Sequence, residues 1–259
     1  MSSEPSFQKL VYALRCAPSI GGAPCVLIRD WVFKRDLLGI QLSDLPQLSD
    51  AYAKQPTLPT SGDSSIRLIN HAIGMRVASV AESAANTVYS MAEIAAQLGN
   101  RVSRGQLSTS FNSLQKAAAA KPEDNPWLFE EGLRGYRRVR ELRTEWTHHS
   151  STFVFTQEGG TILVVKGTRR AKDRLEFSDQ IVCSPADLQH WCEQACRLLD
   201  SFGAHLLSKH VVAMYDLDHE IIDFVFDEHG FPALRDGRPY TRKLTIRRYF
   251  QEGGILPGA

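Results

Sequence analysis

The sequence has almost no net charge and no long apolar run. Thirty Lys and Arg residues stand against 29 Asp and Glu, so composition gives no reason to expect strong nonspecific attraction to nucleic acid. No window approaches the roughly 18 apolar residues that a membrane helix needs, and no small-residue cleavage site follows a long apolar core. We therefore expect neither a membrane span nor a secretory leader.

Cysteine is also scarce, and the five residues are odd in number and scattered through apolar surroundings. This usage favours reduced thiols over a disulfide framework, and it predicts a cytoplasmic protein. The cysteines are Cys16, Cys25, Cys183, Cys192 and Cys196.

Several motifs that would identify an enzyme class are absent from the sequence. It has no glycine-rich phosphate loop, no nucleophile elbow and no zinc-ligand spacing. These absences argue against NTPases, serine-type hydrolases and zinc fingers. We accordingly assign no metal ligands and no cofactor.

Helical periodicity is the strongest signal that the sequence does carry. Apolar residues recur at steps of three or four over residues 66–98, and Gly99-Asn100 follows as a stop signal. Further helices are predicted over residues 108–120 and 133–151. A last helix begins at Ser184, where an N-cap serine, a proline and an acidic residue follow one another in the expected order.

Short β-strands are predicted in two places. Residues 152–166 are predicted to form a β-hairpin with a glycine turn. Past His210 the chain turns to short strands: residues 221–226 and 231–234 are predicted to form a second hairpin, and Asp236-Gly237 marks another turn. The predicted fold is therefore mainly α, a bundle of about four helices with an inserted β-hairpin and a small α+β C-terminal extension. The corresponding units are an N-terminal extension and linker (1–65), the bundle (66–209) and the extension (210–259).

The helix over residues 133–151 carries the most suggestive group of side chains. Val139, Leu142, Trp146 and His149 define one face, and five arginines occupy the rest of the helix. The helix ends at His148-His149, about one turn after Arg143. A histidine titrates near neutral pH and an arginine can neutralise phosphate charge, so this pairing is suited to phosphodiester chemistry.

The order of these elements resembles the HEPN domains of bacteria and archaea over residues 66–209. That family has an Arg, then usually Asn or another polar residue, then three residues and a His, near the end of a bundle helix. Arg143, Thr144 and His148 occupy these places here, and His149 satisfies the looser spacing that the family allows.

The resemblance implies metal-independent RNA cleavage by a homodimer, with a composite site formed from two copies of the motif. His148 would act as general acid or base, Arg143 would stabilise the phosphate, and Thr144 and His149 would assist. Basic residues near this helix end could hold the RNA backbone. These RNA-binding candidates are Arg140, Arg169, Arg170, Lys172 and Arg174.

Two other interpretations fit the same residues. The helix end could be a polar cap with His149 packed under the hairpin, or the chain could be a noncatalytic HEPN-like module in a defence or stress system. Such a module would bind RNA or a protein partner. Thr144 favours the noncatalytic reading, because family members with nuclease chemistry often carry Asn, Asp or His there.

Overall fold

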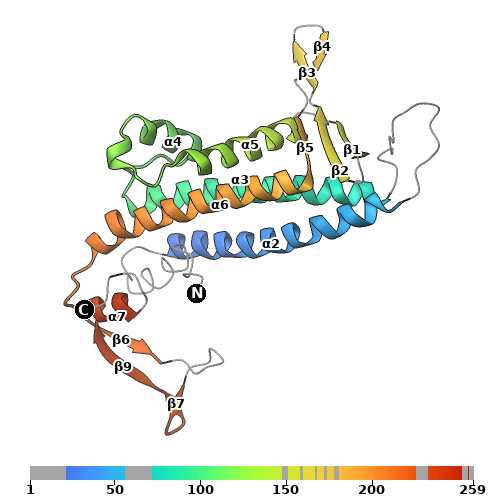
Figure 1. Cartoon of the computed structure of the whole chain (residues 1–259). Coiled ribbons are helices and arrows are strands. Elements are labelled where there is room, and N and C mark those ends of the chain that lie inside the picture. Colours follow the sequence, from blue (N-terminus) through green and yellow to red (C-terminus); the bar gives the residue numbers. More distant parts are fainter. Residues whose placement is uncertain are drawn as a thin grey trace, which may run out of the picture.

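Four long helices lying side by side form most of the described structure, a computed structural model of the 259-residue chain (Figure 1). The structure describes residues 22–55, 72–147, 151–157, 160–166, 168–171, 174–177, 181–225, 233–252 and 256. The four helices are α2 (Gly22–Ala53), α3 (Ala72–Val102), α5 (Glu130–Thr147) and α6 (Pro185–Leu206). The chain is mainly helical with small antiparallel sheets, which confirms the predicted fold class.

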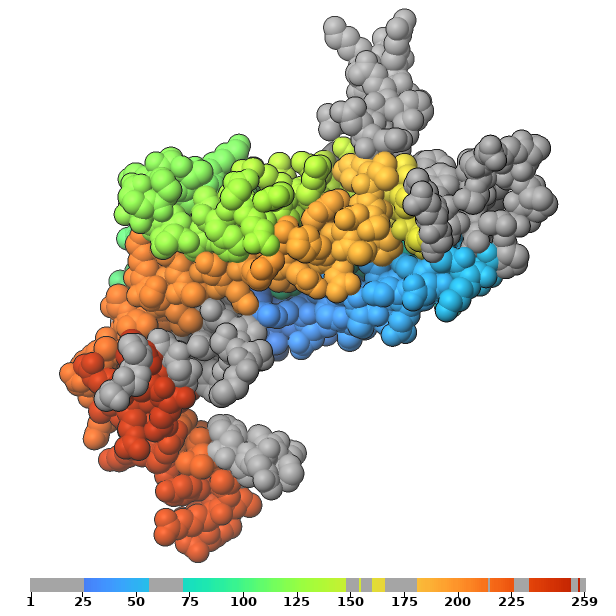
Figure 2. Space-filling view, in the orientation of Figure 1, coloured from blue at the N-terminus to red at the C-terminus, as the bar shows by residue number. Residues whose placement is uncertain are grey.

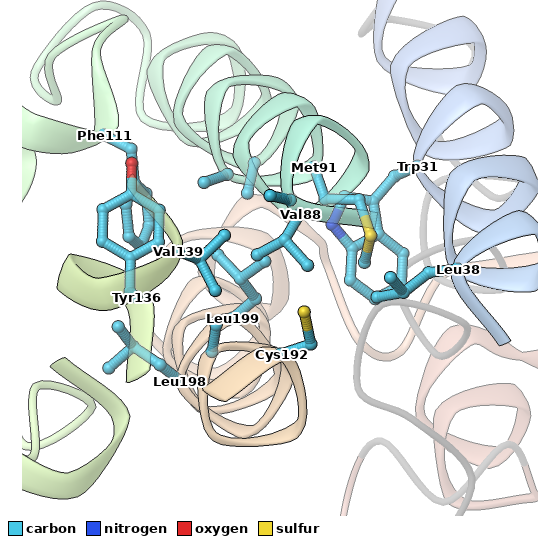
Figure 3. Close-up of a cluster of buried hydrophobic side chains, with 14 of the residues drawn as sticks. Trp31, Leu38, Val88, Met91, Phe111, Tyr136, Val139, Cys192, Leu198 and Leu199 are labelled. Atoms are coloured by element: carbon cyan, nitrogen blue, oxygen red, sulfur yellow. The ribbon is translucent and has the colours of Figure 1, made fainter. Parts of the chain in front are cut away.

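The core between these helices is built from the apolar stripes that the sequence predicts for α3, α5 and α6, together with side chains from α2 (Figure 3). The sequence analysis assigned residues 22–53 to an N-terminal extension. They instead form a bundle helix, and Trp31 and Leu38 on it are buried in the common core. The same buried cluster includes Val88, Met91, Val139, Cys192 and Leu199 (Figure 3).

The predicted helix over residues 108–120 is present as the short α4 (Phe111–Ala119), followed by a 3-10 turn at Pro122–Asp124. Phe111 at its first turn is buried against other aromatic rings. Its ring centroid lies 5.1 Å from that of Tyr136 on α5 and 5.9 Å from that of Phe202 on α6. These ring contacts hold α4 against α5 and α6.

The hairpin predicted between α5 and α6 is confirmed as β1 (Ser151–Gln157) and β2 (Gly160–Lys166), and β5 (Ile181–Cys183) joins it as a third strand. Two hydrogen bonds attach this sheet to the end of α2. The hydroxyl of Tyr52 donates to the carbonyl of Val154 at 2.8 Å, and the hydroxyl of Thr161 donates to the carbonyl of Ser49 at 3.0 Å. The sheet therefore closes one end of the bundle.

The start of α6 has the predicted capping arrangement. The hydroxyl oxygen of Ser184 accepts the N–H of Asp187 at 3.1 Å, and the carboxylate of Asp187 accepts the N–H of Ser184 at 2.8 Å. At its other end α6 continues into a π-helical turn, Leu207–Val211, and a 3-10 turn, Val212–Met214. None of the described helices is both long and apolar enough to cross a membrane.

The C-terminal extension projects from the end of α6 (Figures 1 and 2). The predicted pairing of residues 221–226 with residues 231–234 is wrong for β6 (Glu220–Phe224), which pairs with β9 (Thr241–Thr245). Just past the end of β6, the N–H of Ala233 donates to the carbonyl of Val225 at 2.8 Å, so the two predicted segments do meet there. The tight turn expected at Asp236-Gly237 is confirmed, because both residues have positive φ, 54° and 72°. The remaining elements are β7 (Leu234–Arg235), β8 (Arg238–Pro239) and α7 (Ile246–Glu252).

Candidate functional site around Arg143

The arginines of α5 fall into two groups with different surroundings. Val139, Leu142 and Trp146 turn toward the core as predicted, which leaves Arg134, Arg137 and Arg138 exposed on the outer side. Arg140 and Arg143 are half-buried, because they lie on the side of α5 that meets α3 and α4. Only this second group belongs to a structured polar cluster.

Arg143 is positioned by an aromatic ring of α3. Its guanidinium carbon lies 4.4 Å from the ring centroid of Tyr89, a short cation–π contact. Tyr89 stands one turn before Glu93 on the same helix, so the ring, the guanidinium and a carboxylate are close neighbours. The ring of Tyr89 therefore helps to position the guanidinium of Arg143.

Glu93 joins the cluster to the first turn of α4. Its carboxylate accepts the backbone N–H of Phe111 and a side-chain hydrogen bond from Tyr89. Burial raises the pKa of Glu93 above its usual value, although these two hydrogen bonds and the charge of Arg143 act in the opposite direction. Glu93 is thus a carboxyl group whose proton is held more tightly than in water.

Arg140 and Tyr136 complete the cluster on α5. The guanidinium of Arg140 donates to the side-chain oxygen of Asn112 on α4. Tyr136 is fully buried, and its hydroxyl has no hydrogen-bond partner within the residues that the structure describes. Burial, and next the charge of Glu93, raise the pKa of Tyr136, so this phenol stays protonated.

Thr144 makes its hydrogen bond inside the helix rather than toward the cluster. Its hydroxyl donates to the carbonyl of Arg140 at 2.8 Å, and Thr147 likewise donates to the carbonyl of Arg143 at 3.1 Å. Such bonds to the preceding turn are common for threonine in helices. The hydroxyl proton of Thr144 is therefore already committed, and its assisting role stays a prediction.

The other predicted site residues lie outside the cluster or outside the described residues. His148, His149 and Lys172 are not among the residues that the structure describes. Residues 168–177, which include the other basic candidates, contain a two-stranded ribbon, β3 (Thr168–Ala171) and β4 (Arg174–Phe177). Arg169 and Arg170 belong to β3 and Arg174 to β4, and the ribbon extends beyond the end of the bundle where α5 ends (Figure 1).

Four members of the cluster were not identified from the sequence: Tyr89, Glu93, Asn112 and Tyr136. Tyr89 and Glu93 are four residues apart beside the apolar stripe of α3, which is a weak signal of a shared polar side. Asn112 had no signal, because its partner Arg140 is 28 residues away. Tyr136 reads as a core aromatic, which it also is.

Chemically, the cluster offers two cationic side chains and a carboxyl group with a raised pKa on neighbouring helices. These groups are suited to bind an anionic ester and to exchange a proton. Among the residues that the structure describes, no three His, Cys, Asp or Glu side chains are grouped to hold a metal ion. Comparison of the chain with models of protein families, with curated proteins and with solved structures gives no match.

Proposed function

We propose that this chain is an RNA-binding protein of the HEPN type that cleaves RNA without a metal ion at the Arg143 end of α5. The observation that carries the proposal is the placement of Arg143, half-buried, stacked on Tyr89 and next to the raised-pKa carboxyl of Glu93. An arginine that is fixed before the substrate arrives loses little side-chain entropy when it binds a phosphate.

The division of labour follows from the chemistry of each group. Arg143 would neutralise the charge that develops on the phosphate oxygens, and His148 would take or give the proton of the ribose hydroxyl or of the leaving oxygen. Arg140 and the basic ribbon β3–β4 would hold the flanking RNA backbone. Thr144 supports this arrangement only through its oxygen, because its proton is bonded to Arg140.

A noncatalytic module that binds RNA, or a protein partner in a defence or stress system, is the second candidate. The specific observation in its favour is the hydrogen bond from Thr144 to the backbone of α5, which already uses the hydroxyl proton of that side chain. Cys183 and Cys192 are free and buried, in keeping with the reduced thiols that we expect of a cytoplasmic protein.

The test is cleavage of end-labelled single-stranded RNA in EDTA by the wild-type chain, Arg143→Ala and His148→Ala. Arg137→Ala is the matched control, because Arg137 is an exposed arginine of the same helix. We expect 2',3'-cyclic phosphate ends from wild type and Arg137→Ala. We expect a loss of at least about 100-fold in rate in the other two variants.

Binding to a non-cleavable RNA analogue separates the two candidates. Binding that weakens in Arg143→Ala but not in Arg137→Ala, without any cleavage by wild type, would select the noncatalytic RNA-binding module. Absence of both binding and cleavage would refute an RNA function for the cluster.

A further inference from the structure

Helix α2 carries a line of exposed apolar side chains on the side that faces away from the bundle. Val26, Phe33 and Ile40 are 47%, 67% and 60% exposed. They are spaced seven residues apart, which places them in one nearly straight line over about four helical turns. The opposite side of α2 is buried in the core through Ile28, Trp31, Leu38 and Leu45.

This outer stripe, defined as Val26, Phe33 and Ile40, is unlike the ordinary scatter of single apolar residues on a protein surface. Burying one side of α2 in the core does not require apolar residues on the other side. A straight apolar line at heptad spacing is the shape that a second helix covers. Figure 2 shows α2 along one outer edge of the molecule, where a second helix could reach it.

The charges beside the stripe are placed symmetrically about its centre. Arg29 precedes Phe33 by four residues and Asp36 follows it by three. They are themselves seven residues apart, so they lie along the same flank of the stripe. Both are exposed, and neither has an ion-pair partner within the described part of the chain.

A two-fold axis through Phe33 makes this surface complementary to itself. The rotation reverses the direction of the helix but keeps the flank, so Val26 faces Ile40 of the second copy and Phe33 faces Phe33. On the flank, Arg29 of each copy then faces Asp36 of the other, which gives two opposite-charge contacts. A partner with another sequence would not need this symmetry.

We propose that α2 is the dimerisation surface of this protein, and that it binds the α2 helix of a second copy in antiparallel orientation. The proposal does not rest on RNA cleavage, since it follows from α2 alone. It does determine how the Arg143 clusters would be placed in a dimer. Helix α5 is diagonal to α2 in the bundle, with α3 and α6 between them, so the two clusters would lie on outer sides of the dimer (Figure 1). Each cluster would then act within its own chain, and not as the composite two-chain site that the family resemblance implies.

A single pair of helices buries a small area, so we expect a reversible dimer with a dissociation constant in the micromolar range. Sedimentation velocity of the full chain over a wide concentration range measures it directly. Phe33→Glu should weaken association at least about tenfold, because it puts two like charges at the centre of the interface. Met75→Glu is the control, since Met75 is an equally exposed methionine (56%) on α3 and should change nothing.

Charge exchange provides the sharper test. R29D and D36R should each weaken the dimer several-fold, whereas the double variant R29D/D36R should restore the wild-type constant to within about twofold, because both contacts are re-formed with reversed signs. A double variant as weak as the two single variants combined would overturn the antiparallel pairing. A wild-type chain that stays monomeric throughout, or a Phe33→Glu chain that dimerises normally, would overturn the interface itself.

Circular dichroism of each variant verifies that the helices are intact. RNA binding by Phe33→Glu gives an independent reading, since α2, which carries Phe33, lies across the bundle from α5, which carries Arg143 (Figure 1). Loss of the dimer with unchanged RNA binding would support the interface whether or not the proposed RNA function holds.

Discussion

Alanine in place of Gly135 should destabilise the protein, even though alanine is the better helix former. Gly135 lies in the interior of α5 at a point where that helix approaches α6 closely. A methyl group added there would lie 2.7 Å from the backbone carbonyl oxygen of Trp191 and would also press on the side chain of Gln194. A backbone atom cannot rotate away, so the two helices would have to separate.

The expected magnitude is the difference between two opposing effects. Alanine gains about 1 kcal/mol over glycine in a helix interior, and overpacking costs about 1–3 kcal/mol. Because the obstacle at Gly135 is a backbone oxygen, we place the cost in the upper part of that range. The free energy of unfolding should therefore fall by about 1–2 kcal/mol, which lowers Tm by about 2–8 °C for a chain of this size.

Gly39 is the matched control for this substitution. It is also inside a long helix, but it is exposed and an added methyl would meet nothing within 4 Å. Gly39→Ala should raise the free energy of unfolding by about 0.5–1 kcal/mol. Urea unfolding followed by circular dichroism, at one protein concentration, compares the two variants. If Gly135→Ala proves as stabilising as Gly39→Ala, the close approach of α5 and α6 is not present in the protein.

Three further predictions concern titration, hydrogen bonding and thiol reactivity. The folded-state pKa of Glu93 lies above its usual value of 4.5, so the stability that this group adds is full at lower pH and is lost as the pH rises through the folded pKa. The free energy of unfolding of Glu93→Gln, measured relative to wild type by urea unfolding, should therefore be higher at neutral pH than at acid pH. A difference between the two proteins that does not change with pH would contradict this. Tyr52→Phe leaves the buried carbonyl of Val154 without this donor and should cost about 1–2 kcal/mol in the same assay, whereas no change would show the bond to be absent. Burial raises the pKa of Cys192, so mass spectrometry should find it unmodified by iodoacetamide until urea unfolds the chain, and rapid labelling of the native protein would be the opposite outcome.

The helices that the sequence predicts well are those whose local signals agree. The long apolar stripe of α3 and the capping residues of α6 each specify a helix without help from the rest of the chain. Helix α2 was not predicted as one element, because its local signals disagree. It contains Pro46 and Gly39, and apolar residues occur on its outer side as well as its buried side, so no single stripe marks it.

The strand pairing of β6 and the partners of Arg143 were not predicted because they depend on contacts between segments far apart in the sequence. The neighbouring segment was the natural hairpin partner for β6, yet β6 pairs with β9, with Glu220 opposite Thr245. In the candidate site, Arg143 was predicted from its own helix. Its partners Tyr89 and Glu93 come from α3, and no periodicity on either helix indicates which side chains of the other it meets.

The attachment of the β1–β2–β5 sheet to α2 also affects the order in which the protein can fold during synthesis. Tyr52 bonds to a residue 102 positions later, and Ser49 accepts a bond from a residue 112 positions later. At about 5–20 residues per second, the ribosome needs about 6–22 s to add the intervening 112 residues. The last turns of α2 therefore leave the ribosome long before their partners exist, so this end of the bundle cannot close until the sheet has been synthesised.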